Sequence, residues 1–300
     1  MVSFSKFHGF GNDYVVIEAQ QLADVGDIFE FAKAFCDRHT GVGSDGIAIL
    51  EKIDDQFADF SCRIINPDGS EAGFSGNGTR CAVAYAYFKN LWSAPVLRLK
   101  MNTGVKNYKL VRTESAGHYW FDAEIGKPKL ASDEVPFASA EPLLSVIDQP
   151  VTVHDHSLLV SGVNVGNPVA CVFVENFEFD WRSIGRELEC HPIFPARANI
   201  VFVKVIDREN IELRIWERGA GETSASGTCS SGAAVLTAFR GQTGRQVNVL
   251  SPGGTTVVTW RHDDEILILG RADFVFSGMY RSDVRRQTPD VRRQILSSDI

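Results

Sequence analysis

The sequence predicts an α+β protein made of two copies of one domain, each a mixed β-sheet wrapped around a central helix. Three observations support this prediction. The chain has 300 residues, a length that favours two domains of ordinary size over one large one. A shift of 151 positions lays residues 63–77 over residues 214–228 without a gap. Strand and helix patterns then recur in the same order in both halves.

The aligned stretches read RIINPDGSEAGFSGN and RIWERGAGETSASGT, and they share arginine, isoleucine, glutamate and a Ser-Gly turn at matching positions. Nearby offsets extend the match, because GNDYVVIE (11–18) aligns with GNPVACVFVE (166–175) and LRLKMNTG (97–104) aligns with VNVLSPGG (247–254). Self-similarity of this kind indicates an internal duplication. The predicted domains are 1–127, completed by about 270–280, and 128–270. Residues 126–145, rich in Pro, Ser and Ala, are the predicted linker.

In the first copy a Gly-Asn turn leads into a predicted strand, and an amphipathic helix follows. The expected elements in order are a strand at 14–18, a helix at 28–36, strands at 46–50 and 60–65, the Ser-Gly turn, a helix at 79–88 and paired strands around 96–112. The second copy repeats this order with strands at 158–162 and 169–175, a helix at 181–188, strands at 198–205 and 210–217, a helix at 230–239 and strands through 271. Residues 281–300 carry five arginines and little apolar content, so we expect a loosely ordered tail, with a surface helix as the alternative.

Composition excludes several classes of function. The formal net charge of −8 argues against nucleic acid as a partner, because binding phosphates needs a basic surface. The N-terminal residues contain no signal pattern, and no apolar run reaches the length of a membrane helix, so we expect a cytoplasmic protein with no membrane partner. The six cysteines lack a C-x-x-C pair and predict neither a zinc site nor a disulfide framework.

One nucleotide-binding motif is present but wrongly placed. GVGSDG at 41–46 is a literal G-x-G-x-x-G, yet a predicted helix precedes it and a predicted strand follows, which is the reverse of a dinucleotide site. P-loop, zinc-protease and α/β-hydrolase motifs do not occur in the sequence. We therefore expect no cofactor and no bound metal.

The two Ser-Gly turns are candidate anion sites. Each stands immediately before a predicted helix, where unpaired backbone N–H groups and the positive end of the helix dipole attract a carboxylate. If the two turns face each other, they grip one carboxylate from both sides, with Ser75 and Ser226 on opposite faces of the bound carbon. The alternative is plain helix capping, which serine does well. The duplication, the matching glutamates and the glycines favour a shared site.

Other polar residues stand at comparable places in the two copies. Asn12 and Asn167 each follow a glycine, Asn66 aligns with Glu217, and Arg218 and Asn199 lie nearby in the sequence. Asparagine at turns usually bonds its own backbone. Here we interpret some of these residues as hydrogen-bonding groups for a zwitterionic, amino-acid-like ligand, with Arg218 suited to a carboxylate.

Five stretches resemble the diaminopimelate epimerase family. They are FHGFGNDYVVI, NPDGSEAGFSGNGTRC, VGNP, HPIFPARANIVFV and WERGAGETSASGTCSSGAAV, and the likeness runs in order from about residue 4 to 275. The resemblance implies two homologous domains around a cleft. It also implies inversion of one stereocentre of diaminopimelate without a cofactor, in which one cysteine takes the α-proton and a second cysteine returns one from the other face. The product of that reaction feeds lysine and cell-wall synthesis.

By this resemblance Ser75 and Ser226 stand where the two cysteines belong. Val169 stands where a histidine assists, and Gly46 stands where some members carry a glutamine. The expected catalytic residues are Ser75, Ser226 and Glu217. The expected substrate-binding residues are Asn12, Asn66, Gly76, Asn77, Asn167, Asn199, Glu217, Arg218, Gly227 and Thr228.

Serine in place of cysteine changes the acid–base chemistry. A thiol has a pKa near ~8.5, and an alcohol lies several units higher, with each unit worth ~1.4 kcal/mol. Serine still donates hydrogen bonds, so the resemblance predicts binding of a small amino-acid substrate with epimerase activity reduced or lost. The alternatives are a silent binding homologue, or a related racemase or dehydratase. A homodimer is compatible with the sequence. Cys229, one helical turn after Ser226, is either a packed core residue or a displaced thiol.

Overall fold

The computed structural model describes residues 1–281, so the predicted tail lies outside the described residues except for Arg281. The first copy contains β1 (Val2–Gly9), β2 (Asn12–Glu18), a 3-10 turn (Ala19–Leu22), α1 (Ile28–Cys36), β3 (Ile47–Asp55), β4 (Ala58–Ile65), β5 (Glu71–Ala72), α2 (Gly76–Phe88), β6 (Val96–Met101), β7 (Gly104–Ser115) and β8 (His118–Gly126). The second contains β9 (Gln149–Val153), β10 (His156–Asn164), β11 (Pro168–Phe173), α3 (Trp181–Glu189), β12 (Asn199–Val205), β13 (Asn210–Glu217), β14 (Gly221–Thr223), α4 (Gly227–Phe239), β15 (Gln246–Ser251), β16 (Gly254–Trp260) and β17 (Ile266–Tyr280).

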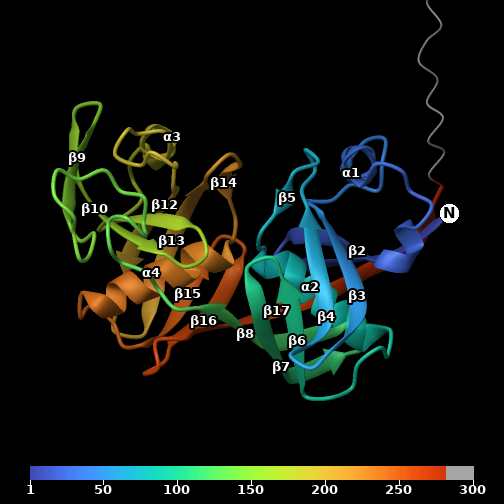
Figure 1. Cartoon of the computed structure of the whole chain (residues 1–300). Helices are drawn as coiled ribbons and strands as arrows, with labels where there is room; N and C mark the ends of the chain where they lie inside the picture. Colours follow the sequence, from blue (N-terminus) through green and yellow to red (C-terminus); the bar gives the residue numbers. More distant parts are fainter. Residues whose placement is uncertain (282–300) are drawn as a thin grey trace, which may run out of the picture.

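In the first copy the strands pair into a ring around α2. The order is β1, β2, β3, β4, β6, β7, β8 and β17, which pairs with β8 through its first part and with β1 through its last part. The pairs β2–β3 and β4–β6 are parallel and the others are antiparallel. The helix α2 lies inside the ring and α1 covers it from outside (Figure 1).

The second copy repeats this arrangement around α4. Strands β10, β11, β12, β13, β15 and β16 pair in sequence with the first part of β17, and β11–β12 and β13–β15 are the parallel pairs. The parallel pairs therefore occupy equivalent positions in the two copies. The predicted fold class, an internally duplicated α+β protein with a sheet wrapped around a helix in each copy, is confirmed.

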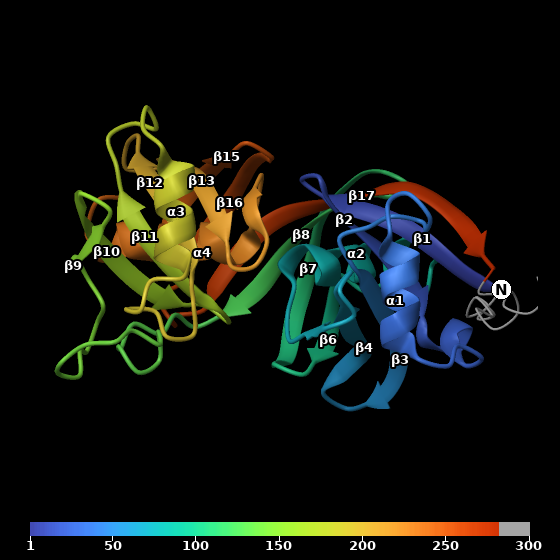
Figure 2. The same cartoon turned by 90° about the horizontal axis from the view of Figure 1, so that it is seen from above.

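Strand β17 pairs with strands of both copies. Its residues 266–269 pair with β16 of the second copy, and its residues 273–280 pair with β1 of the first. On its other edge it pairs with β8 over residues 266–273, from Ile266 opposite Gly126 to Asp273 opposite His118. Figure 2 shows β17 extending from one copy into the other. The first copy is thus completed by residues from the end of the described chain.

The two central helices are buried on nearly every side. Their sequences, GNGTRCAVAYAYF and GTCSSGAAVLTAF, consist mostly of small and apolar residues, which a helix surrounded by sheet requires. Both begin three residues earlier than the apolar period predicted, because their first turns are polar and lie at the serine turns. The outer helix α1 has the predicted bounds, and Asp27 caps it by accepting hydrogen bonds from the N–H groups of Phe29 and Glu30 at 2.8 and 3.2 Å.

Two parts of the chain differ from the sequence expectation. Strand β1 was not predicted, although its burial pattern alternates over most of its length. The predicted linker 126–145 is packed against the second copy, since Val135 and Phe137 are buried in a cluster with Val146 and Trp181. Apolar side chains spaced through this Pro- and Ser-rich stretch explain why it is held against the sheet. No helix among residues 1–281 combines the length and apolar character that crossing a membrane requires.

Candidate active site

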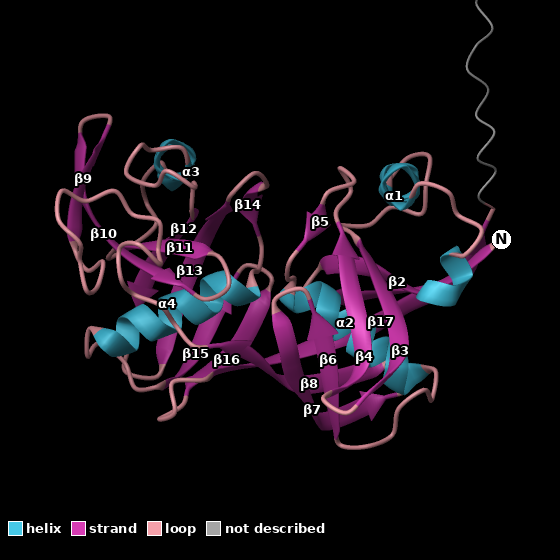
Figure 3. Ribbon diagram, viewed as in Figure 1, coloured by secondary structure: helices cyan, strands magenta, loops and turns pink. Residues whose placement is uncertain are grey.

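A cleft of about 840 Å³ lies where the two copies meet, at the N-terminal ends of α2 and α4. The N-terminal ends of the two helices lie close together (Figure 3). A Cβ atom added to Gly76 of α2 would lie only 4.0 Å from the Cα of Gly227 in α4. Every predicted site residue lines this cleft: Asn12, Asn66, Ser75, Gly76, Asn77, Asn167, Asn199, Glu217, Arg218, Ser226, Gly227 and Thr228. Their roles in substrate binding and catalysis stay predictions.

Ser75 is the N-cap of α2. Its backbone is extended, with φ −139° and ψ 118°, and its Oγ accepts a hydrogen bond from the N–H of Gly78 at 3.1 Å. The same hydroxyl donates to the phenol oxygen of Tyr14 at 2.9 Å. Capping therefore accounts for one of the two hydrogen bonds of this serine, and the second joins it to a titratable side chain.

Ser226 is the N-cap of α4, but its side chain makes no capping hydrogen bond. Its Oγ instead donates to Oε2 of Glu217 at 2.9 Å, and the residue is 8% exposed. Capping alone does not explain this serine. The two serines have the same place in the duplicated fold and different partners.

Glu217 is the last residue of β13, and the short hairpin to β14 brings Thr223 beside it. Its carboxylate accepts hydrogen bonds from Thr223 Oγ1 at 2.8 Å and from Ser226 at 2.9 Å. Burial raises the pKa of this carboxyl above its ordinary value, although the two hydroxyl donors act in the opposite direction. A buried carboxylate with a raised pKa is a stronger base than one in water.

Asn12 is fixed from both ends of its side-chain amide. It donates to Oδ2 of Asp45 at 2.8 Å, and its Oδ1 accepts from Asn77 at 3.1 Å. The side chain of Asn77 in turn accepts a hydrogen bond at 2.8 Å from the guanidinium of Arg80. Arg80 is itself buried, with 1% of its surface exposed. This chain of hydrogen bonds links the β1–β2 turn to the first turn of α2, and it holds two predicted binding residues in one orientation.

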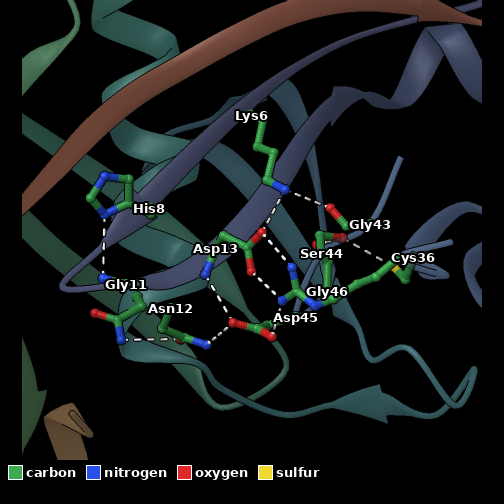
Figure 4. Close-up of polar contacts among 12 residues, drawn as sticks. Lys6, His8, Gly11, Asn12, Asp13, Cys36, Gly43, Ser44, Asp45 and Gly46 are labelled. Carbon is green, nitrogen blue, oxygen red and sulfur yellow. Dashed lines mark hydrogen bonds and ion pairs between the residues drawn. The ribbon is translucent and has the colours of Figure 1, made fainter. Parts of the chain in front are cut away.

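Behind Asn12 lies a cluster of charged groups that supports the turn (Figure 4). Asp13 accepts from Arg38 at 2.7 and 3.2 Å and pairs with Lys6 at 2.6 Å, and Arg38 also pairs with Asp45 at 2.6 Å. Burial alone would raise the pKa of Asp13. The hydrogen bonds from Arg38 and Lys6 outweigh burial and hold this pKa at about 2, below the ordinary 3.8.

The second copy contributes a comparable polar wall. Asn199 donates to the carbonyl of Pro168 at 3.0 Å and accepts from the N–H of Arg218 at 3.0 Å. The Arg218 guanidinium donates to the carbonyl of Ala196 at 2.9 Å and is otherwise exposed at the cleft. Oδ1 of Asn167 is buried and has no hydrogen-bond partner within residues 1–281. An acceptor in this state is suited to the ammonium group of a ligand.

Asn66 directly follows β4, the first copy's equivalent of β13, and occupies the position that aligns with Glu217. Its amide donates to Ser70 Oγ at 2.9 Å within the turn that leads to β5. The two faces of the cleft therefore differ in charge at this pair of positions, with an amide on one side and a carboxylate on the other.

Two residues that the sequence singled out, Val169 and Cys229, lie in the core and not in the cleft. Val169 is fully buried and packs against Gly232 of α4, where an added Cβ would lie 3.0 Å from its Cγ1. It does not line the cleft. Cys229 is also fully buried and absent from the cleft lining, and burial raises its pKa well above the ordinary value. The packed interpretation of Cys229 agrees with this position.

Sequence reasoning missed Tyr14, which lines the cleft and bonds Ser75. The duplication contains the signal that would have identified it. Tyr14 is the second residue after Asn12, and Val169 is the second residue after Asn167. The residue 169 was singled out, whereas its counterpart in the first copy was treated as an ordinary strand residue.

Comparison with known proteins identifies relatives along nearly the whole chain. The family model for diaminopimelate epimerase matches residues 4–130 and 161–275. The diaminopimelate epimerase of Caldanaerobacter subterraneus subsp. tengcongensis is 38% identical over 92% of this chain and 98% of its own length. That of Pelotomaculum thermopropionicum is 35% identical, with the same two coverages.

Solved structures at low identity share the fold. A probable proline racemase from Agrobacterium radiobacter superposes with a TM-score of 0.66 at 14% identity, covering 97% of this chain and 95% of its own. A PhzF-family phenazine biosynthesis protein from Bacillus anthracis gives a TM-score of 0.63 at 17% identity, covering 93% and 99%. The family match and the two curated relatives confirm the resemblance seen in the sequence motifs, and the chain belongs to the diaminopimelate epimerase family.

Proposed function

We propose that this chain binds diaminopimelate in the cleft between its two copies, and that it inverts the bound stereocentre much more slowly than a member with two cysteines. The observation that supports this most directly is the pair of N-capping serines at helix ends that meet across one cleft. By the resemblance each serine stands in the place of a thiol, and every other predicted binding residue lines the same cavity.

The reacting carboxylate is expected to lie between the two helix ends. The first N–H groups of a helix have no partner within the helix, and those of Gly76, Asn77, Gly227 and Thr228 belong to this set. Two helix dipoles aimed at one carboxylate stabilise the negative charge that spreads onto it when Cα loses its proton. This part of the site depends on backbone geometry, so the change from thiol to hydroxyl does not remove it.

The rest of the substrate is expected to lie along the polar walls. Arg218 is suited to the distant carboxylate, since a guanidinium offers two parallel donors. The free Oδ1 of Asn167 is suited to an ammonium group. Asn12, Asn66 and Asn199 complete a lining that can hydrogen-bond both ends of a diamino dicarboxylic acid.

The slow step is the transfer of the α-proton. A serine hydroxyl lies several pKa units above a thiol, and each unit costs ~1.4 kcal/mol of driving force. By the resemblance, valine at position 169 also replaces the histidine that would assist the transfer. Ligand binding is therefore expected to survive while inversion is impaired.

Restoring the thiols tests this proposal. We expect the double variant Ser75→Cys with Ser226→Cys to invert LL-diaminopimelate at least ~100-fold faster than the native chain, since acid–base groups of matched pKa contribute about that much. Deuterium incorporation at Cα and formation of the meso isomer, followed by NMR in D₂O, are the measurements. Ser231→Cys is the matched control, because Ser231 lies in α4 and lines neither the cleft nor the small pocket beside it.

Three other outcomes would contradict the proposal in different ways. If the native chain already inverts diaminopimelate at an ordinary enzymatic rate, the pKa argument is wrong. If the double variant binds diaminopimelate but stays inactive, the chain is a binding homologue whose site has lost more than its thiols. Release of an imine or keto product from a hydroxy amino acid would instead indicate a dehydratase.

A further inference from the structure

The two serines of the cleft have partners of opposite acid–base character. Ser226 donates to the carboxylate of Glu217, and Ser75 donates to the phenol of Tyr14. A carboxylate accepts protons at neutral pH, whereas a phenol is protonated there and can give one away. The pairs differ because Tyr14 and Glu217 come from unrelated positions of the duplicated fold, β2 in the first copy and the end of β13 in the second.

The fold provides a specific place for the Tyr14 ring. A Cβ atom added to Gly46 would lie 2.6 Å from its Cε1, and one added to Gly78 would lie 2.8 Å from the same atom. These glycines stand before β3 and in the first turn of α2. The ring therefore fills a slot between two backbone segments, and only the absence of side chains at both positions leaves room for it.

This slot directs the phenol toward the reacting centre. Tyr14 is 6% exposed and lines the cleft, and within residues 1–281 its hydroxyl bonds only Ser75. Because Ser75 donates this bond, the phenol hydrogen is left free. Burial raises the pKa of Tyr14, and the negative charges of Asp45 and Glu217 also raise it. The group is thus held in its protonated form.

We propose that Tyr14, acting through Ser75, supplies the proton to one face of the bound carbon, while Glu217, with Ser226, removes the proton from the other. This inference rests on the proposed function. On one face the Cα–H bond breaks, its proton passes to Ser226 Oγ, and the serine proton passes to Glu217. On the other face the hydrogen bond between Ser75 and Tyr14 first reverses, because in the structure Ser75 donates it. Ser75 Oγ–H then breaks as the new Cα–H bond forms, and Tyr14 O–H gives a proton to Ser75. Solvent then reprotonates the phenolate and takes the proton from Glu217, which balances the cycle.

Tyr14 is a positioning and relay residue in this scheme, so its test must separate inversion from exchange. In Tyr14→Phe the ring still fills the slot but no proton reaches the Ser75 face. We expect inversion of LL- and meso-diaminopimelate to fall at least ~100-fold. Exchange of the α-hydrogen with retention is expected to persist in the configuration whose hydrogen faces Glu217 and to be absent in the other.

The assay is NMR in D₂O with each isomer, over incubations long enough to detect the slow native enzyme. Tyr85→Phe is the matched control, since Tyr85 is equally buried and its phenol donates to Glu18 at 2.7 Å away from the cleft. Ser75→Ala, which removes the link and keeps Tyr14, should reproduce the Tyr14→Phe pattern. Thermal unfolding of each variant shows that it is folded.

The outcomes of this experiment separate the two proposals. If the native chain inverts slowly and Tyr14→Phe changes the ratio of inversion to exchange, both stand. If Tyr14→Phe keeps the native ratio, the role of Tyr14 is overturned and the proposed function is unaffected. If the native chain exchanges no α-hydrogen of either isomer, its inversion activity is refuted, and the proton route through Tyr14 is refuted with it.

Discussion

Replacing Gly46 by alanine should destabilise the protein, because the added methyl group would collide with the ring of Tyr14. The added Cβ would lie 2.6 Å from Cε1 and 3.2 Å from Cδ1 of Tyr14, and 3.0 Å from the carbonyl oxygen of Ile65. Carbon atoms in contact normally lie about 3.5–4.0 Å apart. The same ring atom also lies close to Gly78, where an added Cβ would be 2.8 Å from Cε1. We therefore expect the ring to shift and the phenol to move away from Ser75.

Overpacking of this kind costs about 1–3 kcal/mol. Each kcal/mol lowers the Tm of a protein of this size class by about 2–4 °C, so a cost near the middle of the range corresponds to a fall of roughly 4–8 °C. Gly26→Ala is the control, since no heavy atom lies within 4 Å of an added Cβ there. It should leave the Tm close to the native value.

A double-mutant cycle with Tyr14→Val isolates the ring contact. Valine at position 14 repeats the residue that the second copy has at 169, and it empties the slot. The contact with Ile65 is present in both backgrounds and cancels in the cycle. We expect a coupling energy of at least ~1 kcal/mol, measured by urea unfolding. Additive costs, with coupling below ~0.3 kcal/mol, would show that the ring adjusts freely and that the slot does not position the phenol.

Two further predictions concern the carboxyl groups. Glu217→Gln should lower exchange of the α-hydrogen with retention at least ~100-fold, as measured by NMR in D₂O. Burial raises the pKa of Glu217, so the ionised carboxylate destabilises the folded protein at pH values above that pKa. At neutral pH the glutamine variant should therefore unfold at the same temperature as the native chain or at a higher one. A fall of several degrees in the unfolding temperature would contradict this. Asp13 acts in the opposite sense, because its pKa of about 2 lies below the ordinary 3.8. Its ionised carboxylate therefore stabilises the folded protein at pH values above 3.8, and this stabilisation is lost as the pH falls toward 2. That loss should amount to roughly 2 kcal/mol, and Asp13→Asn should remove it from urea unfolding curves compared at pH 5 and pH 2.5.

The duplication made most of the fold predictable from the sequence. The bounds of α1 were correct because Asp27 and the apolar period agree on where the helix begins. The starts of α2 and α4 were placed too late, since the glycines and polar residues after Ser75 and Ser226 resemble a turn until the surrounding sheet buries them. The strand β1 was missed although a tight turn joins it to its neighbour β2; only its second partner, β17, lies at the far end of the described chain.

The residues that line the cleft could be predicted from the sequence, but the hydrogen bonds between them could not. Polar residues at turns and helix starts identified the cleft lining, because those positions leave backbone groups free for a ligand. The hydroxyl partners were not predictable, since the choice between capping and bonding Glu217 depends on side-chain geometry at Ser226. The role of the Tyr14 slot likewise depends on two glycines that are 32 and 64 residues further along the chain.

Because β17 pairs with strands of both copies, it also constrains the order in which the protein can fold. The edge of β1 has its outer partner only in residues 273–280, so the first ring cannot close on the ribosome while the second copy is still being made. Until then α2 has an incomplete wall and β1 presents unpaired N–H and C=O groups, a state prone to association with other chains. A truncation before residue 273 should therefore damage the first copy more than the second, although the deleted residues are at the opposite end of the sequence.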